Sequence, residues 1–257
     1  MDGGHSHNFR DKLAAHFARA ARSFAQWAGL QMATGDETPI PAAKDKSKKP
    51  KVIKLKHLKP TQIAVGMKQV ELKQKRLKEL GKDKDKDKLD EFILDRPIRV
   101  VLGPDGDAYV IDHHHLALAL IREGHTTAPV LVEADYSHLP PADFWKKMED
   151  MHYVYPYDAD GIKRPVCCIP DKLTKMQDDP YRALAGFARN DGAFRKDWTP
   201  FAEFKWADYF RTLIPKELVE KHFDKALKKA VELARAPGAS HLPGYIPPKK
   251  PPGMERK

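Results

Sequence analysis

Short apolar runs and longer amphipathic stretches alternate between residues 51 and 136. Four runs of mainly aliphatic residues have the length and β-branched character of strands; they span residues 52–55, 98–102, 108–111 and 129–133. Two longer stretches carry apolar residues at helical spacing, one opened by Pro60-Thr61-Gln62 and running to about Leu80, the other from His113 to Glu123. The segment of alternating Lys and Asp from Lys82 to Lys88 is predicted to be a loop. The pattern predicts the order β-α-β-β-α-β and therefore a small α/β domain with a mixed sheet.

Local turn chemistry supports the second half of this pattern. The sequence Gly-Pro-Asp-Gly-Asp at residues 103–107, between two strands, is typical of a hairpin. Asp112 precedes the second helix and is predicted to be its N-cap, because an aspartate there accepts bonds from unpaired backbone N–H groups. Gly124 is expected to end this helix on its C-terminal side.

Beyond residue 136 the pattern becomes helical and aromatic, with prolines between the helices. Four helices are expected, over residues 141–151, 181–189, 201–213 and 215–235. Aromatic side chains are densest between residues 187 and 210, and packing in a core explains most of them. Base stacking needs cations on the same face, and it is disfavoured because Glu203 and Asp208 lie among the rings.

The two ends of the chain differ from this centre. Residues 8–30 place aromatic and aliphatic residues at spacings of three and four, which predicts an amphipathic helix that docks on the chain itself or on a partner. A membrane-surface helix and a transit peptide are the alternatives. Residues 31–50 are typical of a linker, and residues 247–257 are predicted to be disordered. The expected divisions of the chain are therefore 1–50, 51–136, 137–245 and 246–257.

The excess positive charge is concentrated in one segment. Residues 44–88 contain 17 Lys and Arg against 6 Asp and Glu, whereas the rest of the chain contains 29 against 30. Such a segment can attract nucleic acid, anionic lipid or a nucleotide, and it can equally serve only to keep the protein soluble. Net charge alone therefore does not identify a nucleic-acid-binding protein.

Cysteine use and hydropathy favour a cytoplasmic protein. The two cysteines, Cys167 and Cys168, are adjacent and could pair only through a strained ring, so a structural disulfide is not expected. The sequence contains no run of about 18 apolar residues, and it does not start with the charged and apolar blocks of a secretory signal. These features predict a protein of the reducing cytoplasm without a membrane span.

The candidate chemistry lies in Asp112-His113-His114-His115, where a predicted strand meets a predicted helix. The first turn of a helix presents unpaired N–H groups and a partial positive charge, so it can hold a phosphate group. The same dipole disfavours protonated imidazoles, which predicts that the rings stay neutral or surround an anion. Neutral histidines can donate to phosphate oxygens, accept a proton from an attacking hydroxyl or bind metal, and Asp112 is a candidate base or magnesium ligand.

A purely structural role for these residues is the alternative. Asp112 would then be only an N-cap, one histidine would pack inward, and the others would face water. This interpretation accounts for the aspartate but not for three consecutive histidines. Consecutive side chains on a helix diverge by about 100°, so the three rings cannot surround one zinc ion together, although two of them could share one ligand.

The order of these motifs resembles the ParB-like nuclease superfamily, which includes sulfiredoxins and free serine kinases. The resemblance rests on Val52, Pro60-Thr61-Gln62, residues 97–101 and 109–115, Ala117, Ala119, Gly124 and Pro129-Val130, and then on residues 180–185 and 201–207. It covers about residues 52–235. Helix-opening motifs of these families, such as Asp-Gly-His-His-Arg, hold nucleotide phosphates, and Asp112, His114 and His115 match the form Asp-x-His-His. The resemblance implies a ParB/sulfiredoxin-like domain followed by a C-terminal helical region.

Several positions depart from the family pattern. Leu116 stands where these motifs end in arginine, so a phosphate-binding cation must come from elsewhere. The candidates are Arg99, Arg122 and Arg182. His113 occupies the place of the reactive cysteine of sulfiredoxins, which excludes their chemistry. A serine-kinase relative would carry an early carboxylate base, but the first helix offers Gln62 before Glu71. Residues 181–235 are too aromatic and too evenly charged for the helix-turn-helix of partitioning ParB proteins.

The resulting hypothesis is a protein that binds a nucleotide (ATP, ADP or CTP, with Mg²⁺) or a small phosphorylated molecule, for phosphoryl transfer or phosphodiester cleavage. Asp112, His114 and His115 are the candidate catalytic residues, and Asp112 is the candidate metal ligand. The residues expected to bind the nucleotide are His113, His114, His115, Arg99 and Arg182. The alternatives are a non-catalytic nucleic-acid-binding module that uses residues 44–88, and a scaffold that recruits a partner or membrane through residues 8–30.

Overall fold

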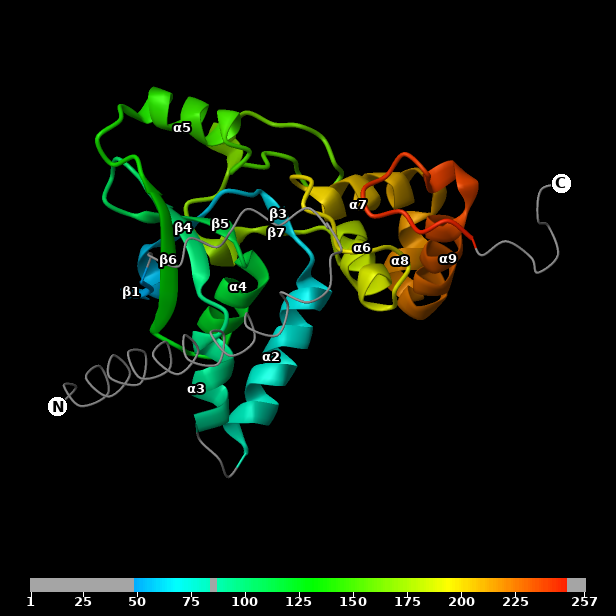
Figure 1. Ribbon diagram of the computed structural model, residues 1–257, viewed down its shortest axis with the longest axis horizontal. Coiled ribbons are helices and arrows are strands. Elements are labelled where there is room, and N and C mark those ends of the chain that lie inside the picture. Colours follow the sequence, from blue (N-terminus) through cyan, green and yellow to red (C-terminus); the bar gives the residue numbers. More distant parts are fainter. Residues whose placement is uncertain (1–48, 84–86, 249–257) are drawn as a thin grey trace, which may run out of the picture.

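The computed structural model describes residues 49–83 and 87–248 of the chain (Figure 1). The strands in these ranges are β1 (Lys51–Lys54), β2 (Leu58–Pro60), β3 (Ala64–Val65), β4 (Ile98–Leu102), β5 (Ala108–Asp112), β6 (Thr127–Asp135) and β7 (Gln177–Asp178). The helices are α2 (Met67–Gly81), α3 (Asp87–Leu94), α4 (His114–Arg122), α5 (Pro141–Asp150), α6 (Pro180–Asn190), α7 (Ala202–Leu213), α8 (Lys216–Lys221) and α9 (Phe223–Arg235). The predicted α/β class, a mixed sheet followed by helices, is confirmed.

Five strands form one mixed sheet in the order β1-β6-β4-β5-β2. Strands β4 and β5 form the predicted antiparallel hairpin, with Val100 opposite Val110. Strand β6 lies parallel to β4, and β2 lies parallel to β5. Helix α4 connects β5 to β6, so its first turn follows directly from an inner strand of the sheet.

Alternate residues of β5 enter two different cores, as expected for a strand covered on both faces. Ala108 and Val110 belong to the core that contains residues of α2, α3 and α4. Tyr109 belongs to a second core, where α5 contributes Phe144 and Met148. Residues 116–120 of α4 are all buried. Helix α4 therefore cannot shift without disturbing the core, and its first turn has a fixed position.

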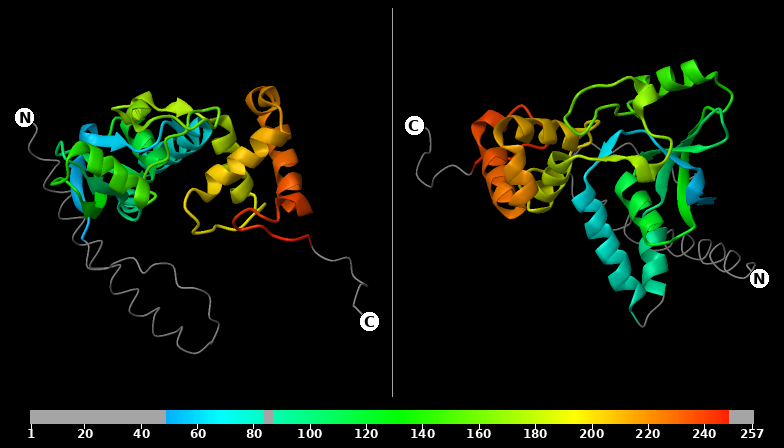
Figure 2. Two further views of the ribbon diagram at one scale, coloured as in Figure 1. Left: turned by 90° about the horizontal axis from the view of Figure 1, so that it is seen from above. Right: turned by 180° about the vertical axis from the view of Figure 1, so that it is seen from behind.

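Helices α6–α9 gather beside the α/β part and enclose a third core (Figure 2). Trp206 and Phe210 are fully buried there, and the Trp206 ring stacks on Phe194 with their centroids 4.2 Å apart. Core packing thus accounts for these rings, as predicted, whereas Trp198 is 66% exposed. Strand β7 pairs in parallel with β3, so the chain beyond residue 136 returns to the first part of the molecule. The domain boundary at residue 136 stays a prediction.

The first helix begins later than predicted. Pro60 ends β2, and α2 starts only at Met67, so the prediction of a helix from Pro60 was wrong up to Gly66. Thr61 explains the difference, because its Oγ1 donates to the carbonyl oxygen of Val110 at 2.7 Å. This partner lies on β5 and holds the chain along the sheet, and no local pattern could have indicated it.

Two other predictions about helices were wrong. The stretch expected as one helix over residues 215–235 is divided into α8 and α9 at His222, whose φ of −137° and ψ of 55° are not helical. The alternating Lys/Asp segment was expected to remain a loop to Lys88, but α3 begins at Asp87. Cys167 and Cys168 are exposed free thiols.

Several predicted segments fall outside the described residues. These are the amphipathic helix over residues 8–30, all but the last two residues of the linker over 31–50, and residues 249–257 of the predicted tail. Within the described ranges, none of the helices combines the length and the apolar character needed to cross a membrane.

Two glycines let α6 lie directly against the start of α2. A Cβ atom on Gly66 would lie 2.7 Å from the backbone nitrogen of Ala183, and a Cβ atom on Gly186 would collide with the side-chain amide of Gln69. Next to this contact, Gln69 Oε1 accepts a hydrogen bond from Arg182 Nη1 at 2.9 Å. The neighbour of Gly66 is backbone, which cannot turn away, so the contact requires glycine there.

Gly66→Ala is expected to lower the free energy of unfolding by about 1–3 kcal/mol, because the added methyl group overpacks against the Ala183 backbone. Urea unfolding measures the effect. Gly81→Ala, at the other end of α2, is the matched control, since its Cβ would make only an ordinary 3.8 Å contact with Leu89. That change should leave stability unchanged or raise it by up to about 1 kcal/mol. Equal effects of the two substitutions would contradict the role assigned to Gly66.

Candidate functional site

The motif Asp112-His113-His114-His115 lies where β5 ends and α4 begins (Figure 1). Asp112 is the last residue of β5, paired with Arg99 of β4, and the prediction that it is the N-cap was wrong. His113 takes the N-cap position, without a side-chain capping bond. Asp112 Oδ1 accepts a bond from the His113 N–H at 2.7 Å. The sheet thus keeps Asp112 extended, and the helix starts one residue later than expected.

His113 has a left-handed backbone, with φ 69° and ψ 27°. This conformation costs roughly 1–2 kcal/mol in residues other than glycine, because Cβ approaches the following carbonyl oxygen. The His113 ring offsets part of this cost, since its Nδ1 lies 3.1 Å from the carbonyl oxygen of Pro97. The backbone also explains why glycine suits this place in the Asp-Gly-His-His-Arg motif. Strain of this kind is typical of functional sites.

His114 points into the interior and is only 3% exposed. Its Nε2 accepts a bond from the Thr61 N–H at 3.3 Å. The carbonyl oxygen of Thr61 accepts in turn from the Tyr155 N–H at 2.9 Å. His114 therefore ties the first turn of α4 to the segment before α2, and this ring nitrogen already has a protein partner.

His115 and Arg182 present the unsatisfied polar atoms of the site. His115 Nε2 and Arg182 Nε are buried and have no hydrogen-bond partner among the described residues. Arg182 comes from α6, is 8% exposed, and is held by Gln69 and by an ion pair with Glu203. Burial lowers the pKa of His115 well below its ordinary value, and the nearby charge of Arg182 adds to this shift. Buried polar atoms without partners are rare, and they mark places where a ligand or water completes the bonding.

The electrostatics of the site keep the three rings neutral. Burial is the largest cause: it lowers the pKa of His113 and His115, and lowers that of His114 to about 3. Burial alone would raise the pKa of Asp112, but the ring and N–H of His113, with Arg99, lower it overall. These directions agree with neutral rings, which is the first of the two possibilities that the helix dipole predicts.

The three arginines considered as substitutes for the missing motif arginine lie in different places. Arg99 is next to Asp112, but its Nε donates to Glu133 at 2.6 Å. Arg122 lies in the last turn of the nine-residue α4, roughly 12 Å from the first turn. Besides burial, the charge of Arg182 lowers the pKa of both His114 and His115, so this arginine lies beside the motif.

Sequence reasoning missed Gln69, Glu203 and Lys73. Gln69 and Glu203 hold the guanidinium group of Arg182. Lys73 follows Gln69 by four residues and therefore shares its face of α2. That shared face could be read from the sequence. The position of this face beside the motif could not be predicted from the sequence, because it depends on how α2 packs against α4 and α6.

The donor set was tested for a metal ion. Within residues 49–83 and 87–248, no group of three or more His, Cys, Asp or Glu side chains is arranged to hold one. Asp112 is the carboxylate of the motif, and the charges that act on its surroundings come from Lys73, Arg99 and Arg182. These residues fit an anion better than a divalent cation held by protein oxygens alone. Magnesium on Asp112 therefore stays a prediction that needs phosphate oxygens among the ligands.

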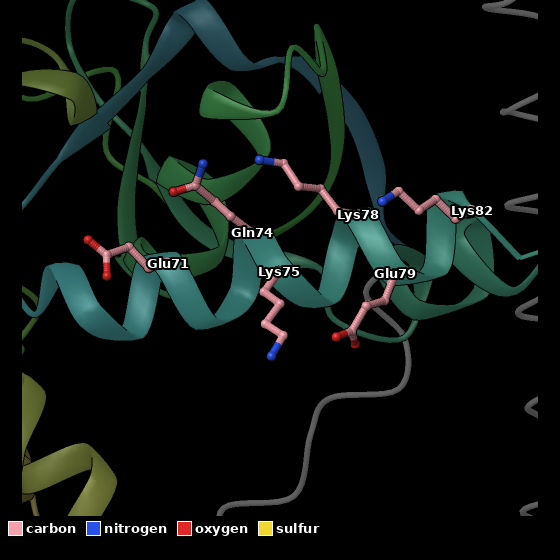
Figure 3. Close-up of a pocket in the computed structure, with 6 residues that line it drawn as sticks. All are labelled: Glu71, Gln74, Lys75, Lys78, Glu79 and Lys82. Atoms are coloured by element: carbon pink, nitrogen blue, oxygen red, sulfur yellow. The ribbon is translucent and has the colours of Figure 1, made fainter. Parts of the chain in front are cut away.

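A shallow groove on the outer face of α2 is separate from the motif. It is lined by Glu71, Gln74, Lys75, Lys78, Glu79 and Lys82 (Figure 3). Acidic and basic side chains alternate along it, and Lys78 pairs with Glu123 at 3.4 Å. Its mixed charge favours a solvated helix surface over a site for one kind of ion.

Fold and site together define a mixed α/β protein whose histidine-rich strand-to-helix junction is completed by an arginine from a C-terminal helix. Residues 51–212 match the family described as "Putative ParB-like nuclease", and the chain belongs to this family. The crystal structure of protein Atu1540 from Agrobacterium tumefaciens is similar, with a TM-score of 0.70 and 40% sequence identity over 78% of this chain and 99% of that chain. No curated protein matches the chain. The resemblance inferred from the sequence is thus confirmed for the family.

Stability is expected to fall as the pH is lowered, because the folded protein holds His114 neutral. Its pKa is lowered from 6.5 to about 3. Below pH 6.5 the His114 ring therefore binds a proton in the unfolded chain but not in the folded chain. Stability is lost progressively as the pH falls toward the pKa of His114 in the folded protein. Between pH 7.5 and pH 5 this costs about 2 kcal/mol. His114→Gln should remove that part of the pH dependence in urea unfolding, whereas the exposed His138→Gln should not. A wild-type slope in His114→Gln would contradict this account.

The left-handed backbone at position 113 predicts an unusual order of stability. His113→Gly should be more stable than His113→Ala by about 1 kcal/mol, because both lose the ring and only alanine keeps the strain. Chemical unfolding of the two variants measures the difference. A more stable alanine variant would argue against strain at this position.

Proposed function

We propose that the protein binds the phosphate group of a nucleotide or another phosphate ester at the N-terminus of α4, for phosphoryl transfer or phosphodiester cleavage. The observation that carries this proposal is the pair of buried, unpartnered atoms, His115 Nε2 and Arg182 Nε. Phosphate oxygens accept hydrogen bonds readily, and bonds from a guanidinium group to phosphate are among the stronger ones in proteins.

The helix start supports the same proposal. The first bond within α4 runs from the Ala117 N–H to the His113 carbonyl oxygen at 2.9 Å, so residues 114–116 have no partner for their N–H groups inside the helix. These groups and the helix dipole favour an anion. The neutral rings add no repelling or attracting charge of their own, so the positive charge comes from side chains outside the motif.

The candidate catalytic residues differ in what they can do. His115 has a ring nitrogen without a protein partner, so it can donate to a phosphate oxygen or accept the proton of an attacking hydroxyl. His114 Nε2 is already bonded to Thr61, which suits a positioning role for α4. Asp112 keeps its charge, and its bond from the His113 N–H leaves it as the proposed contact for a magnesium ion that arrives with a nucleotide.

The alternative function, nucleic-acid binding through residues 44–88, has weaker support. Glu71 and Glu79 lie among the lysines of α2, and Lys59 and Lys78 are already paired with acidic groups. Contact with a phosphate backbone requires a basic face whose charges are available. Residues 44–48 and 84–86 of this segment lie outside the described residues.

Nucleotides are expected to raise the melting temperature in a thermal-shift screen of ATP, ADP and CTP, with and without Mg²⁺. Binding to the folded state alone stabilises it by about 2.7 kcal/mol at a ligand concentration of 100 times Kd. His115→Gln should weaken the affinity by about tenfold, the usual order for one lost bond to a charged ligand. The exposed His138→Gln is the control. A shift that survives the combined change of His114 and His115 to alanine would place the ligand elsewhere.

A further inference from the structure

We propose that Lys73 supplies the phosphate-binding charge that the motif lacks at Leu116. This inference rests on the phosphate site proposed above. The Leu116 side chain is buried in the core, 1% exposed, so that position now serves packing. A replacement charge must therefore reach the first turn of α4 from another element, and α2 packs against α4 in the same core.

The packing of α2 on α6 brings Lys73 to this place. Gly66 meets Ala183 and, three residues later on both helices, Gln69 meets Gly186. Both contacts involve the start of α2, and the second lies three residues further along each of the two helices. Lys73 follows Gln69 by one turn of α2 and Arg189 follows Gly186 by one turn of α6, and the charge of Arg189 acts on Lys73.

Lys73 lacks the partners that other cations of the site have. Arg182 and Arg189 both pair with Glu203. Partly buried Lys73 forms no hydrogen bond or ion pair with any described residue. One carboxylate thus serves two guanidinium groups, and the ammonium group beside them is unpaired. Like charges held close together in a partly buried place are unfavourable until an anion joins them.

The mutual influence of the charges agrees with this placement. Burial lowers the pKa of Lys73. The charges of Arg96 and Arg189 lower this pKa further, and the charge of Asp112 raises it. Besides burial, the Lys73 charge lowers the pKa of both His113 and His115. Lys73 is therefore within electrostatic reach of both ends of the motif. A lysine differs from the usual arginine in one respect, because it loses its charge at alkaline pH.

Titration calorimetry with ATP and with inorganic phosphate tests the inference. Lys73→Gln should weaken binding by about tenfold. Lys73→Arg should restore it to within a few fold of wild type. Lys75→Gln is the matched control, because Lys75 is exposed on the outer face of the same helix. Unchanged affinity in Lys73→Gln would overturn the role of Lys73 and leave the phosphate site standing. Absence of binding to the wild-type protein would overturn the site itself.

A structural role for Lys73 would not produce the following two signatures. Wild-type affinity should fall as the pH is raised into the alkaline range, because burial lowers the pKa of Lys73 and it loses its proton earlier than an ordinary lysine. Lys73→Arg should remove most of this fall. Acetylation by acetic anhydride, read by mass spectrometry, should be slowed by ATP at Lys73 and not at Lys75. Parallel pH profiles, or equal protection of the two lysines, would overturn the proposal without any reliance on how a variant folds.

Discussion

Helix α6 can lie against the start of α2 only because Gly66 and Gly186 have no side chains. This contact brings Gln69 within hydrogen-bond distance of Arg182 and sets a guanidinium group from the C-terminal helices beside a motif of the α/β part. If the helices moved apart, a nearly buried arginine would lose its hydrogen bond to Gln69, at a cost of about 1.5–3 kcal/mol. The geometry of the candidate site therefore depends on a close helix contact at two glycines, which have no side chains that could take part in the proposed chemistry.

The charge arrangement follows from that contact. Glu203 pairs with Arg182 and Arg189, Asp112 stays ionised, and burial keeps the three imidazole rings of the motif neutral. Even so, His115 Nε2 and Arg182 Nε are buried without a hydrogen-bond partner among the described residues. An anion of the size of phosphate satisfies both the donors and the charge, whereas a metal cation would meet only one carboxylate.

Local signals predicted the parts of the fold that depend on neighbouring residues. The hairpin of β4 and β5, the helix after it and α5 all follow from turn residues and periodicity. The start of α2 and the N-cap at His113 could not be predicted in this way. Thr61 is held by Val110 and His114, and Asp112 is kept extended by its pairing with Arg99. The break at His222 carries no proline or glycine, so nothing in the local sequence marks it.

The motif could be recognised in the sequence because its four residues are consecutive. The residues that surround it in the structure could not be recognised in this way. Arg182 was one of three arginines considered, and only the packing of α6 separates it from Arg99 and Arg122. Lys73 lies in a lysine-rich helix where composition singles out no one residue.

The pairing of β3 with β7 and the bond from Arg182 to Gln69 join segments more than a hundred residues apart, 113 in the case of the bond. The last of the five strands of the main sheet ends at Asp135, whereas Arg182 comes long after it. Closing so long a loop is entropically costly, and chains fold from the N-terminal side during synthesis. The order of events is therefore built into the sequence: the sheet and its histidines can form first, and the site is completed only when α6 docks. A chain that stops before α6 can hold the whole motif and still lack the arginine beside it.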